Sequence, residues 1–528
     1  MLIHESTRVS SQESYQRAEM PLRRKLAAAG VLIALACSPQ ASVPPVTPAK
    51  GPVRFLLVND VYILDTLRDG MGGLSRVAAL RDSLERSGPV LFMLAGDVFG
   101  PSLLSKWYAG RHMLEGFNAA SLDYATFGNH EFELNRDTLF ARIAASRFKW
   151  LSSNCGLADG SPFPGVRSWD TLTVHGVRVG LFGSTIVVPY SRYVRCTDPD
   201  SAAHAAIIAL KAMGAEVVVG LTHQLVKSDS ALLAREPNLD AILGGHEHER
   251  QTVAVAGRFV VKADANSRSA QLVTVSVAGR DSHTQTTEVI PIERGMRMDA
   301  AVERLTQAWR DSLTMRLGPE RQLATLAVEI DARDGALRRQ EMPFGNLVTD
   351  AMRLGTGADV ALLNSGALRF DDVLAAGAIT NYQLESIFLF ADDTRIVTFP
   401  LTGARLRELL EHGVSAANFG RGGFLQLSGV AFQFDTLQPD GSRIVGDVVR
   451  ADGRTVSAHE TLRVAFAAYP ACLGGDGYKV PEASGATPCK LVASAPRAVD
   501  LLKEHLTARL GGKVEPPGGG RITRIGKQ

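Results

Sequence analysis

Five short apolar runs in the first half of the chain are each followed by side chains that can bind a metal ion. The runs are residues 55–58, 90–95, 125–127, 217–221 and 242–243, and the segments after them are Asn59-Asp60, Gly96-Asp97, Gly128-Asn129-His130-Glu131, Thr222-His223 and Gly244-Gly245-His246-Glu247-His248. Apolar runs of this length are typical of buried strands. In layered α/β proteins ligands bind outside the carboxyl ends of strands, so we expect these polar residues to meet in one crevice.

The candidate metal ligands are two aspartates, one asparagine and three histidines: Asp60, Asp97, Asn129, His223, His246 and His248. Carboxylate, amide and imidazole donors suit divalent Mn, Zn, Co, Fe, Ni or Mg, rather than the soft metals that thiolates bind. Glycines directly before Asp97, Asn129 and His246 allow sharp turns close to a ligand. A single residue of this kind after a strand is usually a helix cap or a turn former. The whole series in this order favours a metal site.

The elements that must position these residues follow from hydrophobic periodicity. From residue 53 to about 292, short apolar runs alternate with helical patterns, which predicts an α/β layered domain. Residues 299–316 carry apolar side chains at helical spacing and are followed by Gly318-Pro319, which predicts an amphipathic helix that ends there. A second mixed α/β region runs from about 321 to 525.

We therefore divide the chain into four parts: 1–50 an export signal and linker, 51–295 the first domain, 296–320 a linker helix, and 321–528 the second domain. Within the second domain, helical segments are predicted near 346–354 and 403–412. The residues after Gly511 are rich in Gly, Pro and basic side chains, so we expect a weakly ordered tail.

Length and composition agree with this division. A chain of 528 residues is too long for one ordinary core, so two large domains and a leader are expected. Its 45% hydrophobic and 21% charged residues are typical of a soluble globular protein. Lys+Arg of 57 against Asp+Glu of 55 gives a formal charge of +2, which argues against a surface that binds long nucleic acid. Composition leaves open whether the protein is a monomer or a dimer.

The N-terminal segment has the pattern of an export signal. After Met20 a basic segment precedes an apolar run at 26–36, then Cys37 and a Ser/Pro/Ala/Thr-rich stretch to residue 50. The run is too short to cross a bilayer core of about 30 Å. The sequence before Cys37 loosely resembles a bacterial lipobox, which would make Cys37 a lipid anchor, and the alternative is ordinary signal cleavage near Ala41. We expect an exported protein, periplasmic or at the cell surface, and a membrane-anchored lipoprotein under the first alternative.

Besides Cys37 the chain has four cysteines: Cys155, Cys196, Cys472 and Cys489. Four cysteines allow three pairings, and an oxidising compartment permits disulfides. The simplest arrangement pairs Cys155 with Cys196 and Cys472 with Cys489, within domains, and the alternative is buried free thiols. None lies in a CxxC or Cys/His arrangement typical of zinc.

The motifs GNHE, TH and GGHxH in this order resemble those of the calcineurin-like metallophosphoesterases, specifically the two-domain branch of periplasmic UDP-sugar hydrolases, 5′-nucleotidases and ecto-5′-nucleotidases. The resemblance covers nearly all of residues 53–525. It implies an α/β fold, with a four-layer αββα sandwich domain, a linker helix and a smaller α/β 5′-nucleotidase C-terminal domain.

The resemblance also implies roles for single residues. It implies one metal ion at Asp60, Asp97 and His248, and a second at Asn129, His223 and His246, with Asp97 bridging the two. It makes His130 the catalytic histidine, which contacts the phosphate and helps the leaving group depart, and Glu133 its acidic partner. Two such ions about 3.5–4 Å apart can activate water and hold both the attacking and the leaving oxygen.

Two residues depart from the family pattern. The first motif is normally Asp-x-His, and here it is Asp60-Val61-Tyr62. Tyr62 is a poor ligand at neutral pH because the ordinary pKa of a phenol is about 10, so the first ion should bind more weakly or select another metal. Glu133 stands where the family has Asp, which keeps the charge on a longer side chain.

The C-terminal half carries Gly345-Asn346-Leu347, Asn364-Ser365-Gly366-Ala367-Leu368-Arg369, Gly423-Phe424-Leu425-Gln426 and Gly474-Gly475-Asp476-Gly477-Tyr478. Their order is similar to that of the substrate domain of the same nucleotidases. The resemblance implies Arg338 and Arg369 as phosphate arginines, Asn364 as a base contact, Phe390 as one stacking ring and Asp476 as the ribose contact. The second ring falls on Pro470, and the neighbouring Tyr469 takes this role after a shift of one residue.

These features predict an exported phosphohydrolase of nucleoside 5′-monophosphates, with 2′,3′-cyclic nucleotides and nucleotide sugars as further candidate substrates. The alternative is a non-catalytic surface lipoprotein that uses the fold as a binding module. A third alternative is a related hydrolase of another phosphoester or of a thioester-like sulfur substrate.

Overall fold

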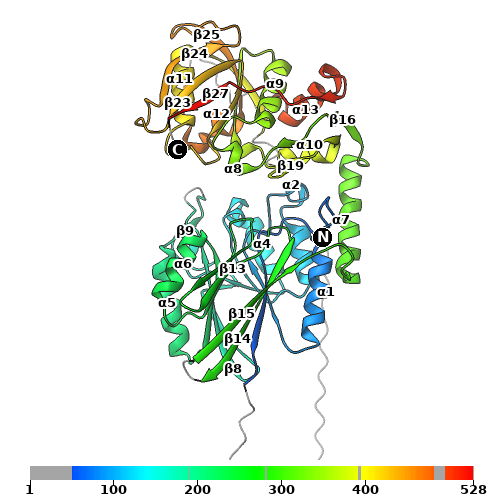
Figure 1. Ribbon diagram of the computed structural model, residues 1–528, viewed down its shortest axis with the longest axis vertical. Coiled ribbons are helices and arrows are strands. Elements are labelled where there is room, and N and C mark those ends of the chain that lie inside the picture. The colour runs from blue at the N-terminus through cyan, green and yellow to red at the C-terminus, as the bar shows by residue number, and fades with distance from the viewer. Residues whose placement is uncertain (1–49, 189–190, 280–281, 390–393, 481–493, 527–528) are drawn as a thin grey trace, which may run out of the picture. The chain divides into compact units, whose positions relative to one another are not determined.

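The first half of the chain folds into two β-sheets that pack face to face (Figure 1). The computed structural model describes residues 50–188, 191–279, 282–389, 394–480 and 494–526, and all of them belong to one compact unit. The seven strands of the first sheet lie in the order β15 (Ser282–Pro291), β14 (Ser269–Gly279), β1 (Val53–Val58), β2 (Leu91–Ala95), β3 (Tyr124–Thr126), β4 (Lys149–Leu151) and β6 (Val166–Arg167). The six strands of the second lie in the order β12 (Gln251–Val255), β13 (Arg258–Lys262), β11 (Ala241–Gly244), β10 (Val217–His223), β8 (Val177–Thr185) and β7 (Trp169–Val174).

Alternate side chains of the central strands enter different hydrophobic cores. In β1, Phe55 and Leu57 lie in the core between the sheets, whereas Leu56 and Val58 lie in the core under the helices. The outer face of the first sheet is covered by α1 (Leu74–Glu85) and α3 (Arg111–Ala119), and that of the second by α5 (Pro199–Ala212) and α6 (Val226–Arg235). Figure 1 shows α1 on one side of the two sheets and α5 and α6 on the other. Successive side chains of a strand point to opposite faces of the sheet, so both faces of these central strands are buried. The predicted four-layer αββα sandwich is therefore confirmed.

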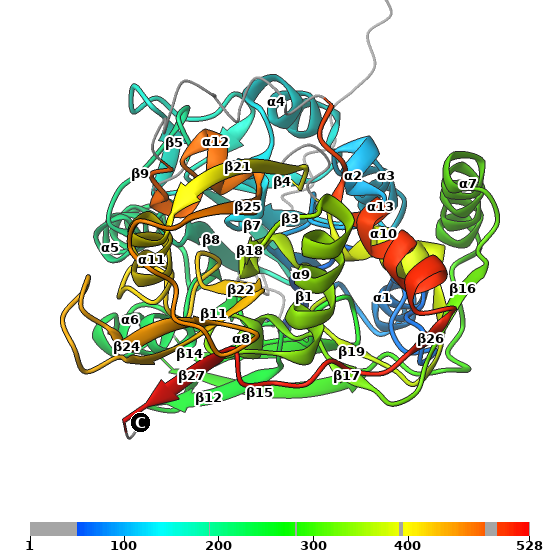
Figure 2. The ribbon, with the colours of Figure 1, turned by 90° about the horizontal axis from the view of Figure 1, so that it is seen from above.

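The second half is a smaller α/β domain around a sheet of four strands in the order β21 (Ile396–Thr402), β25 (Thr461–Ala467), β18 (Val360–Asn364) and β22 (Leu425–Ser428). Its predicted helices at 346–354 and 403–412 are α9 (Pro343–Thr356) and α11 (Gly403–Gly413). Figure 2 shows α9 beside α13 (Ala498–Glu504), and the two helices share one core with β18. On the other face of β18, Val360 and Leu362 pack in a second core with α11.

The described residues of this domain form three smaller sheets as well. They are β20 (Gly377–Thr380), β16 (Gln322–Leu326) and β26 (Lys513–Val514), then β24 (Ile444–Arg450), β23 (Val430–Asp435) and β27 (Ile522–Ile525), and finally β17 (Ile330–Asp331) with β19 (Val373–Leu374). Strands β26 and β27 lie in the segment after Gly511, so the expectation of a weakly ordered tail is wrong. The reason is pairing with strands distant in the sequence, since β26 pairs with β16 and β27 with β23.

The helix predicted at 299–316 is α7 (Ala300–Leu317). The carboxylate of Asp299 caps its first turn by accepting the N–H groups of Ala301 and Val302, each at 2.9 Å, and Gly318 follows its last turn. Its buried residues Val302 and Trp309 belong to the core under α1 and α3. The helix that joins the two halves is therefore packed onto the first. Among the described residues, no helix is long and apolar enough to cross a membrane.

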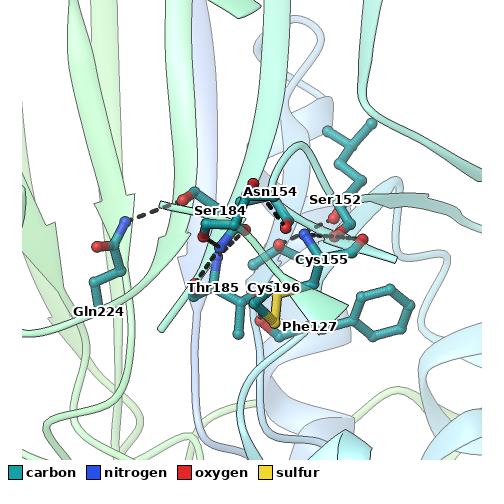
Figure 3. Close-up of a disulfide and its surroundings, with 11 residues drawn as sticks. Phe127, Ser152, Asn154, Cys155, Ser184, Thr185, Cys196 and Gln224 are labelled. Carbon is teal, nitrogen blue, oxygen red and sulfur yellow. Dashed lines mark hydrogen bonds between the residues drawn. A yellow bond between two sulfur atoms is a disulfide. The ribbon is translucent and has the colours of Figure 1, made fainter. Parts of the chain in front are cut away.

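A disulfide links Cys155 in β5 (Cys155–Leu157) to Cys196 in β9 (Val194–Cys196), as Figure 3 shows. The two cysteines are directly paired positions of these antiparallel strands. The neighbouring Asn154 connects them to the sheet, because its amide exchanges hydrogen bonds of 2.7 and 2.9 Å with the backbone of Thr185. The predicted Cys155–Cys196 pairing is thus confirmed. Cys37 and Cys489 lie outside the described residues, so the Cys472–Cys489 pairing and the lipid anchor stay predictions.

Replacing both Cys155 and Cys196 by Ala should lower the free energy of unfolding by about 2–4 kcal/mol, because the link closes a loop with a sequence separation of 41 residues. Denaturant unfolding of the two proteins would measure the difference. A reductant should destabilise the native protein by a similar amount and leave the double variant unchanged. Equal stabilities of the two oxidised proteins would contradict a structural role for the disulfide.

Candidate active site

The predicted ligands meet where β1, β2, β3, β10 and β11 end. Ligand atoms of Asp60, Asp97 and His223 all lie within 4.8 Å of one another. Asn129 Oδ1 lies 3.3 Å from His223 Nε2, and the His246 ring lies 5.2 Å from the His223 ring. His248 Nε2 lies 3.7 Å from Asp60 Oδ1. The structure therefore brings all six side chains together, although they come from five loops and two sheets.

Asp97 lies at the centre of this cluster and is 2% exposed. Its Oδ2 lies 3.1 Å from His223 Nε2, and its Oδ1 accepts the backbone N–H of His130 at 2.9 Å. Burial alone would raise the pKa of Asp97, but the neighbouring His223 and His130 hold it well below its usual range. Gly128 leaves room for the carboxylate, since a Cβ at that position would lie 2.0 Å from Asp97 Oδ1.

The backbone turns sharply at three of the six residues. Asp60, Asp97 and His246 have φ of 52°, 56° and 86°, in the left-handed region that non-glycine residues rarely occupy. Conformations of this kind cost on the order of 1–3 kcal/mol each and cluster at functional sites. The turns aim the side chains back across the strand ends instead of away from them.

The imidazoles of His223 and His248 are held by their Nδ1 atoms. Nδ1 of His223 lies 2.8 Å from the carbonyl oxygen of Ala95, and Nδ1 of His248 lies 3.1 Å from Asp371 Oδ2. An Nδ1–H that donates to these oxygens leaves the Nε2 lone pair facing the carboxylates, which is the tautomer that a metal ligand needs. Burial and the neighbouring His223 lower the pKa of His246 to about 4, so the imidazole of His246 is neutral.

The charges of the cluster fit a bound cation. Asp60 and Asp97 are both buried and lie side by side, so their negative charges need compensation. Burial alone would lower the pKa of His223, but Asp97 and Asp60 raise it to about 10, which makes a proton on His223 the compensating charge. A divalent ion among the same carboxylate and imidazole donors would replace that proton, and oxygen and nitrogen ligands of this kind suit the metals named above.

His130 lies at the edge of the cluster and is oriented by Glu133. Its Nδ1 is 2.7 Å from Glu133 Oε1, and its Nε2 is 3.9 Å from Asp97 Oδ2. Burial alone would lower the pKa of His130, but Glu133 and Asp97 raise it above its ordinary value. The longer Glu133 therefore still reaches the histidine. With Nδ1 held by Glu133, Nε2 is the nitrogen that faces the cluster.

Residues of the second half reach this cluster. Nη2 of Arg369 lies 3.3 Å from His130 Nε2, and Nη1 of Arg369 lies 3.4 Å from Asp334 Oδ2. Arg338 donates to the same oxygen of Asp334. The two predicted phosphate arginines thus share one carboxylate.

The other predicted substrate residues lie together beside the loop that carries Asp476. Asn364 Nδ2 donates to Asp476 Oδ2 at 2.9 Å. The Tyr469 ring packs against Gly475, where an added Cβ would lie 2.3 Å from a ring carbon. Pro470, the other candidate for the second ring position, is buried in α12 (Ala468–Leu473). Phe390 lies outside the described residues.

Comparison with known proteins agrees with this geometry. Residues 53–250 match the family "Calcineurin-like phosphoesterase", and residues 322–483 match "5′-nucleotidase, C-terminal domain". The chain belongs to the two-domain 5′-nucleotidase family. Members of this family are metal-dependent phosphoester hydrolases.

Individual relatives are distant but cover most of the chain. The 5′-nucleotidase of Bos taurus is 25% identical over 78% of this chain and 79% of its own length. The Trifunctional nucleotide phosphoesterase protein YfkN of Bacillus subtilis is 24% identical over 85% of the chain, which spans only 34% of that longer protein. The structure of a 5′-nucleotidase precursor from Thermus thermophilus superposes with a TM-score of 0.76 at 25% identity, over 90% of this chain and all of the other.

Tyr62 stands where the resemblance to the 5′-nucleotidase family implies a histidine, and its hydroxyl points into the cluster. Its Oη lies 3.2 Å from Asp97 Oδ2, 3.2 Å from His248 Nε2 and 3.4 Å from Asp60 Oδ1. Burial and the two carboxylates raise the pKa of Tyr62 well above 10. The phenol therefore keeps its proton and donates to a carboxylate, so it fills the position without adding an imidazole ligand.

Two further acidic residues of the site were not predicted from the sequence. Glu131 is buried, and its carboxylate accepts the N–H groups of Asp97, Val98, Phe99 and Gly128, at 2.6–3.0 Å, which fixes the loops around Asp97. Asp371 holds His248 and also accepts the N–H of Asp334 at 2.9 Å. In the sequence, these two residues could have been recognised only by their places: Glu131 ends the GNHE motif, and Asp371 lies two residues after Arg369.

Replacing Asp97 by Asn keeps the shape of the side chain but removes the charge at the centre of the cluster. We expect the protein to lose at least one divalent ion and hydrolysis of a small phosphoester to fall by roughly 10²–10³-fold. Metal content after dialysis and initial rates would measure both, with unfolding of the metal-free proteins as the control for folding. Full metal content with near-normal turnover would contradict the assignment.

Replacing Tyr62 by His should restore a neutral imidazole donor between Asp60, Asp97 and His248. We expect the weaker of the bound ions to bind roughly tenfold more tightly, about 1.4 kcal/mol, as measured by competition with a chelator. Tyr62→Phe is the matched control, because it removes the hydroxyl without adding a ligand, and it should not tighten binding. If His and Phe behave alike, residue 62 does not contribute to the metal shell.

Proposed function

We propose that this chain is an exported phosphohydrolase that removes phosphate from nucleoside 5′-monophosphates with the help of two divalent ions. The observation that carries the proposal is the 3.3 Å contact between Arg369 of the C-terminal domain and His130, next to the Asp60–Asp97–His223 cluster. A phosphate that meets the guanidinium of Arg369 therefore also meets the imidazole of His130.

The residues that would hold the ions are Asp60, Asp97 and His248 for one, and Asn129, His223 and His246 together with Asp97 for the other. When bound, such ions supply a water of lowered pKa and neutralise phosphate charge. The buried carboxylates, the neutral His246 and the Nδ1-anchored His223 and His248 support this assignment.

His130 is the residue proposed to act on the leaving group. Glu133 fixes Nδ1, so a proton carried on Nε2 is directed toward the phosphate site rather than toward the protein. The raised pKa of His130 favours the protonated imidazole, which can donate to the oxygen of the departing nucleoside. The same geometry weighs against the non-catalytic binding module, which has no need of an oriented histidine–glutamate pair.

Arg338 and Arg369 are proposed to bind the phosphate oxygens. The side chain of Arg369 is 12% exposed and that of Arg338 is 28% exposed, so both guanidinium groups are partly withdrawn from water, where hydrogen bonds to anions are strong. Among the described residues, the buried Nε of Arg338 has no hydrogen-bond partner. A buried N–H group without a partner at this position supports the binding of an anionic ligand there.

The nucleoside is proposed to lie beside Asn364, Asp476 and Tyr469. The Oδ1 atom of Asn364 is buried and accepts no hydrogen bond from any described residue, so a polar ligand atom can complete it. Asp476 has φ of 53°, which turns its carboxylate toward Asn364. Tyr469 offers an aromatic ring beside them, and Phe390 remains the proposed second ring.

Export is supported by the disulfide between Cys155 and Cys196, because structural disulfides persist in oxidising compartments and are rare in the cytosol. A periplasmic or cell-surface location fits both the pattern at 20–50 and this bond. Lipid anchoring through Cys37 is part of the proposal and is tested by mass spectrometry of the mature N-terminus.

The test of the proposed function is phosphate release by the metal-stripped protein from nucleoside 5′-monophosphates, 2′,3′-cyclic nucleotides, nucleotide sugars and a small phosphoester, with Mn, Co, Zn, Mg or Ca added singly. We expect 5′-monophosphates to give the highest kcat/KM. The absence of phosphate release with every ion would overturn the proposal. A higher kcat/KM for the small phosphoester would contradict the nucleotide specificity but not the hydrolysis.

Two variants separate phosphate binding from nucleoside binding. Arg369→Met should reduce kcat/KM for both the nucleotide and the small phosphoester by roughly 10- to 150-fold, taking 1.5–3 kcal/mol for a hydrogen bond to a charged group. Asn364→Ala should raise KM for the nucleotide alone by about 2- to 13-fold, from 0.5–1.5 kcal/mol for one hydrogen bond. Equal losses on both substrates for Asn364→Ala would show that this residue supports the fold instead of reading the nucleoside.

A further inference from the structure

A lysine is fully buried behind the metal cluster, at the end of β13. Lys262 is 0% exposed. Its Nζ donates to the carbonyl oxygen of Gln224 at 2.5 Å, to that of Gly245 at 2.7 Å, and to Glu247 Oε2. A second carboxylate, Asp229 Oδ2, lies 3.1 Å from Nζ. All three N–H groups of the ammonium are therefore used, and the charge is balanced inside the protein.

The partners of Lys262 flank three of the proposed metal ligands. Gln224 directly follows His223, Gly245 directly precedes His246, and Glu247 lies between His246 and His248. One ammonium group thus contacts both loops that carry histidines in the second sheet. The other oxygen of Glu247 accepts the N–H of Val226 at 2.6 Å, which ties the same loop to the start of α6.

The sheet holds His223, which pairs with Thr185 of β8, but it does not fix the residues after His223 or the loop after Gly244. Strands β10 and β11 pair in parallel up to Thr222 and Gly244, and the pairing of β11 with β13 ends at Gly244 and Lys262. Beyond these positions the carbonyl groups of Gln224 and Gly245 turn inward, where an unpaired carbonyl would be costly. Gly244 leaves space for the lysine, because a Cβ there would lie 2.9 Å from Lys262 Cε and 3.1 Å from Asp229 Oδ2.

We propose that Lys262 is a positioning residue of the metal centre, whose ammonium group fixes the loops of His223, His246 and His248 and thereby sets the affinity for divalent ions. The inference rests on the proposed metal role of these histidines. Groups that orient metal ligands from behind commonly change metal affinity by about 10- to 100-fold when they are removed. Glu247 and Asp229 compensate the buried charge and keep Lys262 in place.

The same strand offers a matched control at its opposite end. Arg258 begins β13, and its guanidinium donates to the carbonyl oxygens of Leu233, Glu236 and Leu239 at 2.6–2.7 Å. Like Lys262, Arg258 uses a charged side-chain group to bind three hydrogen-bond acceptors in neighbouring segments. None of those acceptors is next to a proposed metal ligand in the sequence. A change at Arg258 therefore tests the loss of a structural cation that does not position a metal ligand.

The experiment compares Lys262→Met and Arg258→Met in the full chain. We measure the dissociation constants of Mn²⁺ and Zn²⁺ by competition with a chelator, thermal unfolding of the metal-free proteins, and phosphate release from a small phosphoester. Both variants should be less stable without metal. Only Lys262→Met should bind the ions about 10- to 100-fold more weakly, with its lost activity partly restored by excess metal.

Glu247→Gln is the second variant, and it keeps the proposal testable if Lys262→Met does not fold. It retains the side-chain size and an oxygen for the Val226 N–H but weakens the hold on the ammonium, so metal affinity should fall by about 3- to 10-fold. Unchanged metal affinity in the folded variants, or equal losses in Arg258→Met, would overturn the positioning role. If the native protein binds divalent ions but does not hydrolyse nucleotides, the proposed function is wrong and this inference stands. If the native protein binds no divalent ion, both are wrong.

Discussion

Two carboxylates, Asp60 and Asp97, lie side by side with almost no access to water, and the rest of the site depends on that constraint. Buried like charges repel and lose their hydration, so they persist only where cations and hydrogen-bond donors surround them. His223, His130 and His248 lie against them on the protein side. The strained turns and the glycine beside Asp97 are needed to bring these groups within reach. A site built in this way is stable only when positive charge is present in it.

Compensation of charge continues outward on both sides of the cluster. Behind it, Lys262 forms ion pairs with Glu247 and Asp229 and holds the backbone of two histidine loops. In front of it, Asp371 and Asp334 bind His248, Arg338 and Arg369. Ions of opposite sign therefore alternate from the core of the first domain to the arginines of the second. The proposed metal ligands and the proposed phosphate arginines are linked through this series, so a change in one group affects its neighbours.

Much of this arrangement could be predicted because the ligands follow strands, and strand ends are visible as apolar runs. The four-layer sandwich, α7, α9, α11 and the Cys155–Cys196 bond follow from patterns within short segments or from simple pairing. Lys262, Asp371 and the strands after Gly511 were missed because their partners are distant in the sequence. A lysine in an apolar strand carries no local sign of what its ammonium group will contact. The position of Tyr62 was indicated by the resemblance, but its contacts with three ligands needed the structure.

The carboxylate of Asp334 accepts hydrogen bonds from both Arg338 and Arg369, so the two proposed phosphate arginines already hold an anion of the chain. An incoming phosphate would compete with the carboxylate of Asp334 for the two guanidinium groups. Binding is then an exchange of one anion for another, and the net gain is the difference between two similar attractions. The same carboxylate would return to the arginines when inorganic phosphate leaves, which lowers the cost of releasing that product. Under the proposed function, the protein would thereby exchange some affinity for turnover.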